Sequence, residues 1–339
     1  MHMADALVAP AVAGTMYAAS IAAASYSVYS VRKENDPKKI PLMGVMGAFV
    51  FAAQMINFTI PGTGSSGHLC GGMLLSALLG PAAGFLSMIA ILLIQCLFFA
   101  DGGLLALGCN VWNMAFYGCF IGSFLFWKPF MKNGASRLKI ILASVLGSIV
   151  TLQLGAFSVV LETSISGITE LPFGTFVAVM QPIHLAIGLV EGLITAAVLI
   201  FVYETRPELL WGLPDGAEKK NRLGLGWVFG ILGGLALLVG GALSLFASEF
   251  PDGLEWSIAR VTGSTEVEAA GSVYETAEKI QEATSFLPDY GFKETETAAG
   301  TTVSGIVGGL IVLALLIGAC FLFRFFLRKK KAAGAEIKS

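Results

Sequence analysis

The chain has 339 residues, of which 55% are hydrophobic and only 13% are charged, and its formal net charge is −2. Soluble domains carry about 25% charged residues, so the composition excludes an ordinary soluble protein, and the near-zero charge gives no sign of a nucleic-acid partner. The apolar runs are far longer than the roughly 9–11 residues of a barrel strand, so we expect helices to cross a membrane.

Seven apolar runs have about the 20 residues that a helix needs to span a bilayer. The first run lacks the basic flank of a secretory signal, because the first basic residue of the chain is Arg32, so we expect it to be retained as a helix. In chain order the runs are 8–31, 40–58, 109–127, 138–160, 176–203, 224–247 and 302–327.

The apolar stretch 69–100 is long enough for one helix or for two short ones. Lys and Arg collect in cytoplasmic loops, and the segments 31–39 and 127–139, on either side of this stretch, are both basic. Both segments then lie on one face of the membrane. Since two of the seven runs also separate them, the stretch must contribute zero or two crossings.

Gly80-Pro81 lies near the middle of this stretch, and a proline there breaks or kinks a helix. We therefore expect two short helices, at about 69–80 and 82–100. The first is either a full crossing or a re-entrant segment, which a membrane tolerates only where it lines protein or a cavity.

These elements predict an all-α polytopic membrane protein with nine crossings, its N-terminus outside and its basic C-terminus in the cytoplasm. The segment 212–223 breaks the apolar pattern, and we interpret it as a cytoplasmic linker. It divides the chain into a seven-helix module, 1–211, and a second module, 224–339. The second module has two transmembrane helices with an acidic extracytoplasmic segment, 248–300, between them.

The five cysteines lie in or beside apolar runs without C-x-x-C spacing. We interpret them as small hydrophobic residues, with metal ligands or disulfides as the alternative. The sequence has no phosphate-binding loop, no HExxH motif and no nucleophile triad, so we expect neither ATP hydrolysis nor another catalytic activity. If the protein transports a solute, we expect the energy to come from another chain.

The chain has three histidines, and the predicted topology puts His2, His68 and His184 on the outer side. The amine of Met1, the amide nitrogen of His2 and its imidazole can chelate one metal ion. A fourth nitrogen would complete a square plane, the geometry that Ni(II) or Cu(II) prefers. His68 is the candidate, since the glycines and serines around it, including Ser66, let the backbone approach closely. The alternative is that His2 is merely a solvated second residue.

Further polar residues are expected beside this candidate site. Glu191 follows His184 by seven positions on the same helix face. An intramembrane carboxylate is expensive, so Glu191 is either functional or hydrogen-bonded to a neighbouring helix. His184 can orient a metal ligand. Asn110 and Asn113 share a helical face at an outer end, where they either bind the folded N-terminus or join helices.

Gly44, Ala48 and Ala52 form a stripe of small residues on one helix face. Such stripes let two helices approach closely. The stripe therefore serves either ordinary packing within the chain or docking of a partner subunit.

Several stretches resemble one known family. "MHMADAL", "SGHLCGG", "CNVWNMAFYG" and "HLAIGLVEGLIT" are similar to the NikM/CbiM family, the membrane substrate-binding (S) components of energy-coupling factor nickel/cobalt transporters. This resemblance covers about 1–205. In the second module, "FPDGLEW" (250–256) and "FLPDYGF" (286–292) resemble the PDGLE domain of the accessory NikN/CbiN component, so the chain resembles a fusion of the two.

The resemblance implies a seven-helix bundle into which the N-terminus is tucked. It implies that the Met1 amine, the His2 amide nitrogen and imidazole, and His68 hold the metal in a square plane, under loops near 59–68 and 158–175. It also implies a cell-membrane location and two kinds of partner. These are a transmembrane coupling (T) subunit, docked on the small-residue stripe, and ABC-type ATPase subunits.

The start "MHMADAL" resembles the nickel branch of the family more than the cobalt branch, which implies nickel as the transported ion, and we expect no organic cofactor. Copper is a chemical rival, because nitrogen ligands bind it more tightly than nickel.

Two other functions are possible for the chain. A self-powered secondary transporter would need a path for a coupling ion, and Glu191 is the one residue that offers such a path. A metal sensor would bind the metal but would not take it up. The outer segment either helps to load metal or braces the loops, and Asp252 and Glu255 can equally cap the local fold.

Overall fold

The computed structural model describes residues 1–34, 39–214, 223–265, 267–293 and 298–336. The fold consists of packed helices with one short antiparallel hairpin, β1 (Phe58–Ile60) and β2 (Ser65–Gly67). In chain order the helices are α1 (Pro10–Glu34), α2 (Lys39–Gln54), α3 (Gly72–Leu79), α4 (Pro81–Phe99), α5 (Leu107–Asn110), a π-helical stretch (Val111–Trp127), α6 (Lys128–Met131), α7 (Arg137–Ser166), α8 (Phe173–Thr205), α9 (Leu225–Gly241), α10 (Gly253–Thr262), α11 (Ser272–Thr284) and α12 (Ala298–Glu336), with short 3-10 turns at Asp5–Leu7, Pro207–Leu209, Leu243–Phe246 and Pro288–Tyr290.

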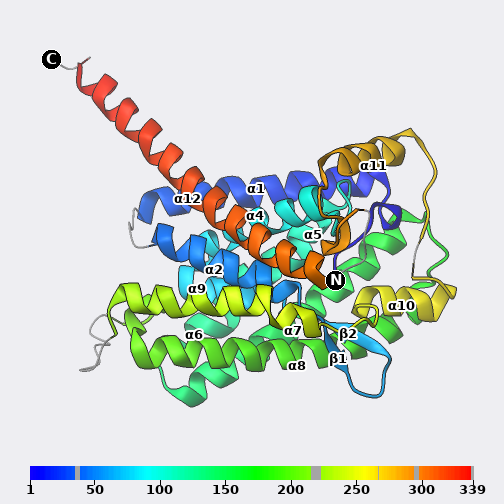
Figure 1. The fold of residues 1–339 in the computed structure, drawn as a ribbon, viewed down its shortest axis with the longest axis horizontal. Helices are drawn as coiled ribbons and strands as arrows, with labels where there is room; N and C mark the ends of the chain where they lie inside the picture. Colours follow the sequence, from blue (N-terminus) through cyan, green and yellow to red (C-terminus); the bar gives the residue numbers. More distant parts are fainter. Residues whose placement is uncertain (35–38, 215–222, 266, 294–297, 337–339) are drawn as a thin grey trace.

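The long helices run side by side, and the connecting elements gather at the ends of the bundle (Figure 1). The N-terminus, the hairpin, α10 and α11 lie toward one end, whereas the C-terminal part of α12 projects from the other (Figure 1). Segments from the first and last parts of the sequence therefore meet at the same end of the molecule.

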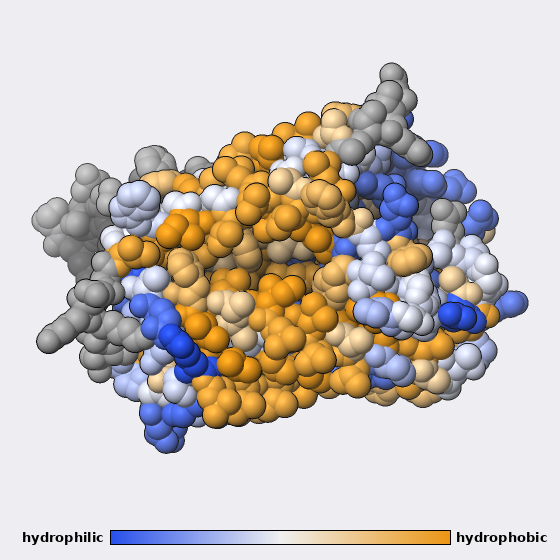
Figure 2. Space-filling view, turned by 60° about the horizontal axis from the view of Figure 1, so that its bottom comes forward, coloured by the Kyte–Doolittle hydropathy of each residue, from blue (hydrophilic) through white to orange (hydrophobic). Residues whose placement is uncertain are grey.

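Among the described residues, five helices are long and apolar enough to cross a membrane: α4, the continuous helix Leu107–Met131, α7, α8 and the part Ala299–Phe321 of α12. The helices α2 and α9 are apolar but shorter. Figure 2 shows an apolar belt between two hydrophilic ends on one face of the molecule. These features support a multi-pass membrane protein, while the nine crossings and the orientation of the termini stay predictions.

The predicted break in the stretch 69–100 is confirmed. Gly80 separates α3 from α4 with a φ of 82°, a conformation that glycine adopts without a steric penalty, and Pro81 is the first residue of α4. The eight residues of α3 are fewer than the roughly 20 that cross a bilayer, which favours the re-entrant alternative for this helix.

The helix α7 is longer than its apolar pattern indicated. The hydroxyl of Ser136 caps its start by accepting from the backbone N–H of Lys139, and Gly167, with a φ of 62°, ends it after Ser166. The expectation of a loop over 158–175 is therefore wrong up to Ser166, because polar residues at the end of α7 are still accommodated in regular helix.

The two modules pack tightly together through α2, which contacts both α9 and α12, and these two helices also contact each other. A Cβ atom on Gly44 would lie only 2.9 Å from Leu313 of α12, and one on Gly240 of α9 would lie 3.1 Å from the Cβ of Ala52. The small-residue stripe that includes Ala48 thus serves packing within the chain. This packing favours the first of the two alternatives, while the docking of another subunit on the stripe stays a prediction.

The predicted linker 212–223 falls mostly outside the described residues, and the division at this linker stays a prediction. None of the five cysteines, all of which lie in the described residues, forms a disulfide, and their interpretation as small hydrophobic residues stays a prediction. Four of them are buried and Cys320 is half-buried.

Candidate metal centre

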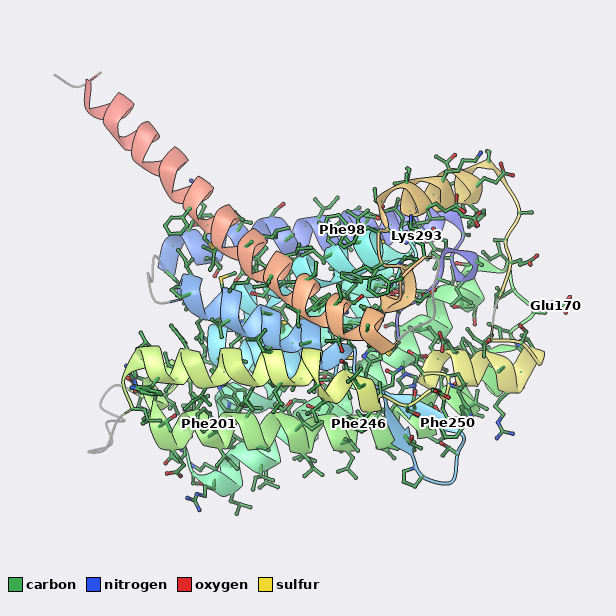
Figure 3. All side chains as sticks on the ribbon, viewed as in Figure 1. Phe98, Glu170, Phe201, Phe246, Phe250 and Lys293 are labelled. Atoms are coloured by element: carbon green, nitrogen blue, oxygen red, sulfur yellow. The ribbon has the colours of Figure 1, made fainter. Side chains whose placement is uncertain are left out.

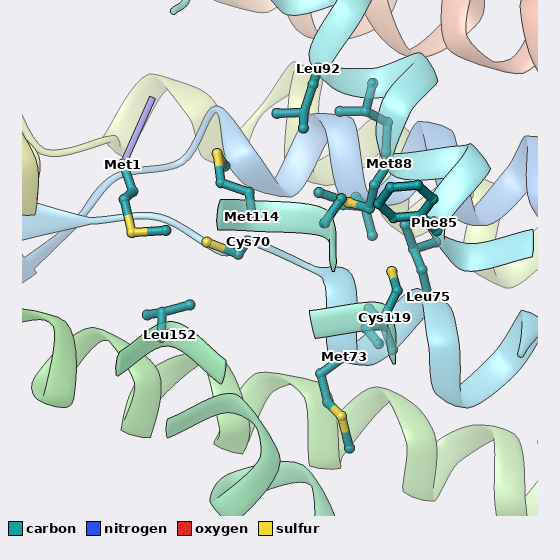
Figure 4. Packing of buried hydrophobic residues seen from close by; sticks show 14 of the residues in the cluster. Met1, Cys70, Met73, Leu75, Phe85, Met88, Leu92, Met114, Cys119 and Leu152 are labelled. Carbon is teal, nitrogen blue, oxygen red and sulfur yellow. The ribbon is translucent and has the colours of Figure 1, made fainter. Parts of the chain in front are cut away.

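The first residues of the chain are folded into the bundle instead of lying in solvent. Met1 is 3% exposed and Met3 is fully buried. The side chain of Met1 points into the apolar core beside Cys70 and Leu152 (Figure 4). Burial of these apolar side chains draws the terminal amine, a polar group, into the interior, where it needs hydrogen-bonding partners.

Asn110 holds this N-terminal segment, as the sequence analysis expected. Its Oδ1 accepts from the backbone N–H of Met3 at 2.7 Å, and its Nδ2 donates to the carbonyl of the same residue at 3.1 Å. Asn113 donates to Glu162 at 2.6 Å and lies 3.5 Å from the sulfur of Met3. Asn110 therefore hydrogen-bonds directly to the backbone of the segment that carries the candidate ligands. Asn113 contacts the same segment through the side chain of Met3.

The hairpin of β1 and β2 places His68 beside this N-terminal segment. Phe58 pairs with Gly67, so β2 ends one residue before His68. A Cβ on Gly67 would lie 2.5 Å from a side-chain carbon of Ile187, which shows that only glycine lets β2 approach α8 this closely. The close approach fixes the position of the His68 ring, which is 6% exposed.

The amine of Met1 and the imidazole of His68 are in direct contact. The amine nitrogen lies 2.8 Å from Nε2 of His68. Nδ1 of the same ring lies 3.1 Å from the carbonyl of Leu69, an acceptor, so Nδ1 carries the proton and the lone pair of Nε2 faces the amine. A nitrogen with a free lone pair is what a metal ligand requires.

The spacing of these two nitrogens fits neighbouring ligands of one metal ion. Metal–nitrogen bonds of about 2.0 Å that meet at a right angle place their nitrogens about 2.8 Å apart. The observed separation between the Met1 amine and His68 Nε2 is 2.8 Å. The two groups can therefore bind a metal side by side with little movement.

The imidazole of His2 is nearby but engaged elsewhere. Its ring lies 5.2 Å, centroid to centroid, from the ring of His68. Nδ1 lies 3.0 Å from a carboxylate oxygen of Asp101, and Nε2 lies 3.2 Å from the side-chain oxygen of Gln95. For Nδ1 of His2 to join the amine on a metal, it has to leave Asp101.

Gln54, Gln95 and Asp101 were missed by the sequence analysis. Gln95, whose side-chain oxygen lies beside His2, donates to Gln54 at 2.8 Å, and Gln54 donates to the carbonyl of Cys70 at 2.7 Å, so two hydrogen bonds join the neighbour of His2 to the segment that follows His68. A glutamine inside an apolar helix was the available signal, because amide side chains there usually bind a neighbouring segment.

Glu191 does not face the amine. Its two carboxylate oxygens accept from the backbone N–H groups of Cys70 and Gly71, each at 3.0 Å. Of the two alternatives for Glu191, a functional carboxylate or a structural hydrogen-bonding group, these contacts are those of the second. Glu191 fixes the chain immediately after His68.

His184 lines the cavity beside His68. Its Nδ1 donates to the carbonyl of Met180 at 2.8 Å, so its Nε2 is an acceptor. Within the part of the chain that the structure describes, this buried Nε2 has no hydrogen-bond partner. Ser66, in contrast, is not among the residues that line the cavity, and its hydroxyl donates to the carbonyl of Phe250 at 2.7 Å.

The cavity at the centre of the site is very small. Its volume is about 10 Å³, close to the minimum that holds one water molecule. This volume is the size of a single small ion or water molecule. Its lining residues are Met1, Gly67, His68, Cys70, Leu152, His184, Ile187, Asp252 and Gly253.

An ion pair closes this cavity on the side of the second module. Asp252 contacts the Met1 amine, and its Oδ2 lies 3.6 Å from Nε2 of His68. Burial by itself would lower the pKa of the amine, but the Asp252 carboxylate outweighs it and raises the pKa above its ordinary value. Burial by itself would raise the pKa of Asp252, but the charged amine holds it well below its usual range.

The imidazole of His2 is held neutral. Its pKa is lowered to about 4, mainly because burial disfavours the charged ring, although Asp101 opposes this shift. Among the described residues, no group of three or more His, Cys, Asp or Glu side chains is arranged to hold a metal ion.

The chain matches two family models in succession. Residues 2–209 match CbiM, the cobalt uptake substrate-specific transmembrane region, and residues 226–325 match the PDGLE domain. The chain is 37% identical to a putative fused nickel transport protein NikMN of Archaeoglobus fulgidus, over 93% of this chain and 96% of the relative. It is 31% identical to a probable fused nickel transport protein LarMN of Lactiplantibacillus plantarum, over 76% and 78%.

The chain is also similar to a cobalt transport protein and to a solved transporter structure. A cobalt transport protein CbiM of Sorangium cellulosum is 34% identical over 53% of this chain and 80% of that protein. The crystal structure of a truncated transition metal transporter superposes with a TM-score of 0.53 at 29% identity, over 60% of this chain and 99% of the other. The superposed part is the size of the first module.

Proposed function

The chain belongs to the CbiM family of cobalt uptake substrate-specific transmembrane regions, joined to a PDGLE domain, and from this we propose that it is the substrate-capture subunit of an ATP-driven importer for nickel ions. The similarity to fused nickel transport proteins over nearly the whole chain supports nickel. Cobalt is the alternative in the same role, since a cobalt transport protein also matches the first module.

The metal is held by four nitrogens in this proposal: the Met1 amine, the His2 amide nitrogen, the His2 imidazole and Nε2 of His68. The observation that carries it is the 2.8 Å separation between the Met1 amine and His68 Nε2, in a cavity of about 10 Å³. A planar set of four nitrogens suits Ni(II).

Capture then has three requirements. The ion sheds its water, because the cavity has no space for a hydration shell. Nδ1 of His2 exchanges the Asp101 carboxylate for the metal. The amine and the His2 amide lose protons, so binding releases protons and strengthens as the pH rises.

The remaining expectations belong to the same proposal. A coupling subunit and ABC-type ATPases supply the energy, since the sequence has no phosphate-binding loop. The N-terminus lies outside and the C-terminus in the cytoplasm, so the metal centre faces the outer side of the cell membrane. The first module, 1–211, binds the ion, and the second module, 224–339, covers it.

The test is metal content after purification through a C-terminal tag, with mass spectrometry to establish that the chain starts at Met1. One alanine is inserted between Met1 and His2, and the matched control carries the same insertion after Gly134, where a glycine Cβ would meet nothing within 4 Å. We expect the first insertion to abolish stoichiometric nickel and the control to retain it. Loading the protein with cobalt in parallel identifies the preferred ion. If the variant with the insertion between Met1 and His2 still retains metal, the proposal is contradicted.

A further inference from the structure

The second module extends one carboxylate to the candidate metal centre. Asp252 precedes α10, and its Oδ1 caps that helix by accepting from the backbone N–H groups of Leu254 at 2.8 Å and Glu255 at 2.9 Å. Its other oxygen, Oδ2, contacts the Met1 amine. A single side chain thus begins a helix and borders the site.

Backbone contacts between the hairpin and the second module fix this carboxylate. Ser66 donates its N–H to the carbonyl of Pro251 at 2.8 Å and its hydroxyl to the carbonyl of Phe250 at 2.7 Å. The indole of Trp256 donates to the carbonyl of Thr63 at 3.1 Å. Phe250 lies beside the hairpin in Figure 3. The start of α10 is therefore attached to the same hairpin that carries His68.

The approach of α10 is also as close as the chain allows. A Cβ on Gly253 would lie 2.8 Å from Ile187 and 3.1 Å from the ring of His184. Glycine at this position lets the helix lie directly against α8. Asp252 is consequently held at the cavity by packing as well as by hydrogen bonds, and its side chain is only 13% exposed.

A metal bound to the four proposed nitrogens carries a net charge. A divalent cation on one deprotonated amide and three neutral nitrogens has a charge of +1, and an unpaired buried charge is costly. Asp101 is hydrogen-bonded by Tyr290, and Glu191 accepts two backbone N–H groups. Asp252 is the carboxylate that borders both the amine and His68.

The contact with the amine can survive metal binding. An amine that ligates a metal keeps two N–H groups, so it can still donate to Asp252 while its lone pair points at the ion. Carboxylates that accept from metal ligands orient them and strengthen binding. The role that fits Asp252 is therefore beside the metal, acting through the amine, and not on it.

We propose that Asp252 positions the ligating amine and supplies the counter-charge for the bound ion, so that the metal centre is shared between the two modules. The inference rests on the proposed function, because it assumes that the amine and His68 bind the metal. It assigns to the PDGLE motif a residue that acts on metal affinity.

The test uses the full chain and nickel alone. Asp252→Asn removes the charge but keeps the helix cap, since Asn ranks with Asp at that position. We expect the dissociation constant for nickel, from chelator competition, to rise about 10- to 100-fold. The visible absorption of the bound nickel should stay that of wild type, because the four nitrogens are retained. Glu278→Gln, an exposed carboxylate of the same module, is the matched control and should bind as wild type does.

Two results would overturn the inference: an affinity of Asp252→Asn equal to or tighter than that of wild type, or a changed absorption spectrum, which would make Asp252 a ligand itself. Thermal unfolding of the metal-free variant shows whether it is folded, and Asp252→Ser provides a second neutral cap. His68→Ala separates the two proposals. If His68→Ala still binds nickel, the proposed function fails. If it loses nickel while Asp252→Asn binds as wild type does, the present inference alone fails.

Discussion

The amine nitrogen of Met1 lies 2.8 Å from Nε2 of His68, although 67 positions separate the two residues in the sequence. The contact is buried, and the tautomer of His68 turns a lone pair toward the amine. It joins the N-terminal segment to the hairpin at the point where a small cavity has formed.

Replacing His68 tests the contact directly. His68→Ala removes the fourth nitrogen and leaves a three-nitrogen chelate that is open to water, so we expect nickel affinity to fall by at least about 100-fold, the upper end for loss of a mere supporting residue. Equilibrium dialysis with nickel measures it. Leu69→Ala, at the neighbouring position, keeps every nitrogen, and a loss of the same size in that variant would speak against His68 as a ligand.

Glu191 should act on stability. Glu191→Gln leaves one carbonyl oxygen for the two N–H groups of Cys70 and Gly71, so one buried donor loses its partner. The expected loss is about 1–3 kcal/mol in the free energy of unfolding, seen as a lower thermal midpoint in detergent. Glu170→Gln, in an exposed loop at the end of the molecule (Figure 3), is the control. Unchanged stability of Glu191→Gln would return Glu191 to the list of coupling-ion candidates.

The close approach of β2 to α8 makes a second prediction about the site. Gly67→Ala forces a methyl group against Ile187 and should displace the neighbouring His68, weakening nickel binding. Adding Ile187→Ala restores the space and should recover part of the lost affinity. A double-mutant cycle measures this coupling. Equal affinities of Gly67→Ala with and without the second substitution would show that the clash is not what moves the histidine.

The contact between α9 and α12 can be broken by one methyl group. A Cβ on Gly305 of α12 would lie 2.2 Å from the carbonyl oxygen of Gly240 of α9, and backbone cannot move aside easily. We expect Gly305→Ala to cost about 1–3 kcal/mol by overpacking. Gly318→Ala on the same helix meets nothing within 4 Å and serves as the control. The thermal unfolding midpoints of the two variants test this prediction. Equal midpoints would refute the close packing of α9 on α12.

The sequence by itself determined those features that depend only on residues close together along the chain. Apolar runs indicated a helical membrane protein, Gly80-Pro81 marked the break between α3 and α4, and the start of the chain with His68 indicated the nitrogens of a metal site. Such features arise from hydrophobic length, backbone conformation and the chemistry of donor atoms, all of which can be read locally.

Only the tertiary structure decided which distant residues meet. Met1 and Asp252 are 251 positions apart, and their ion pair depends on how α10 lies against the hairpin and α8. The stripe at Gly44 was compatible with a partner or with the chain itself, and the structure shows α12 packed against it. The physical reason is that a small-residue stripe or a lone carboxylate is complementary to many surfaces. Its actual partner is set by the close packing of whole helices, which no local pattern records.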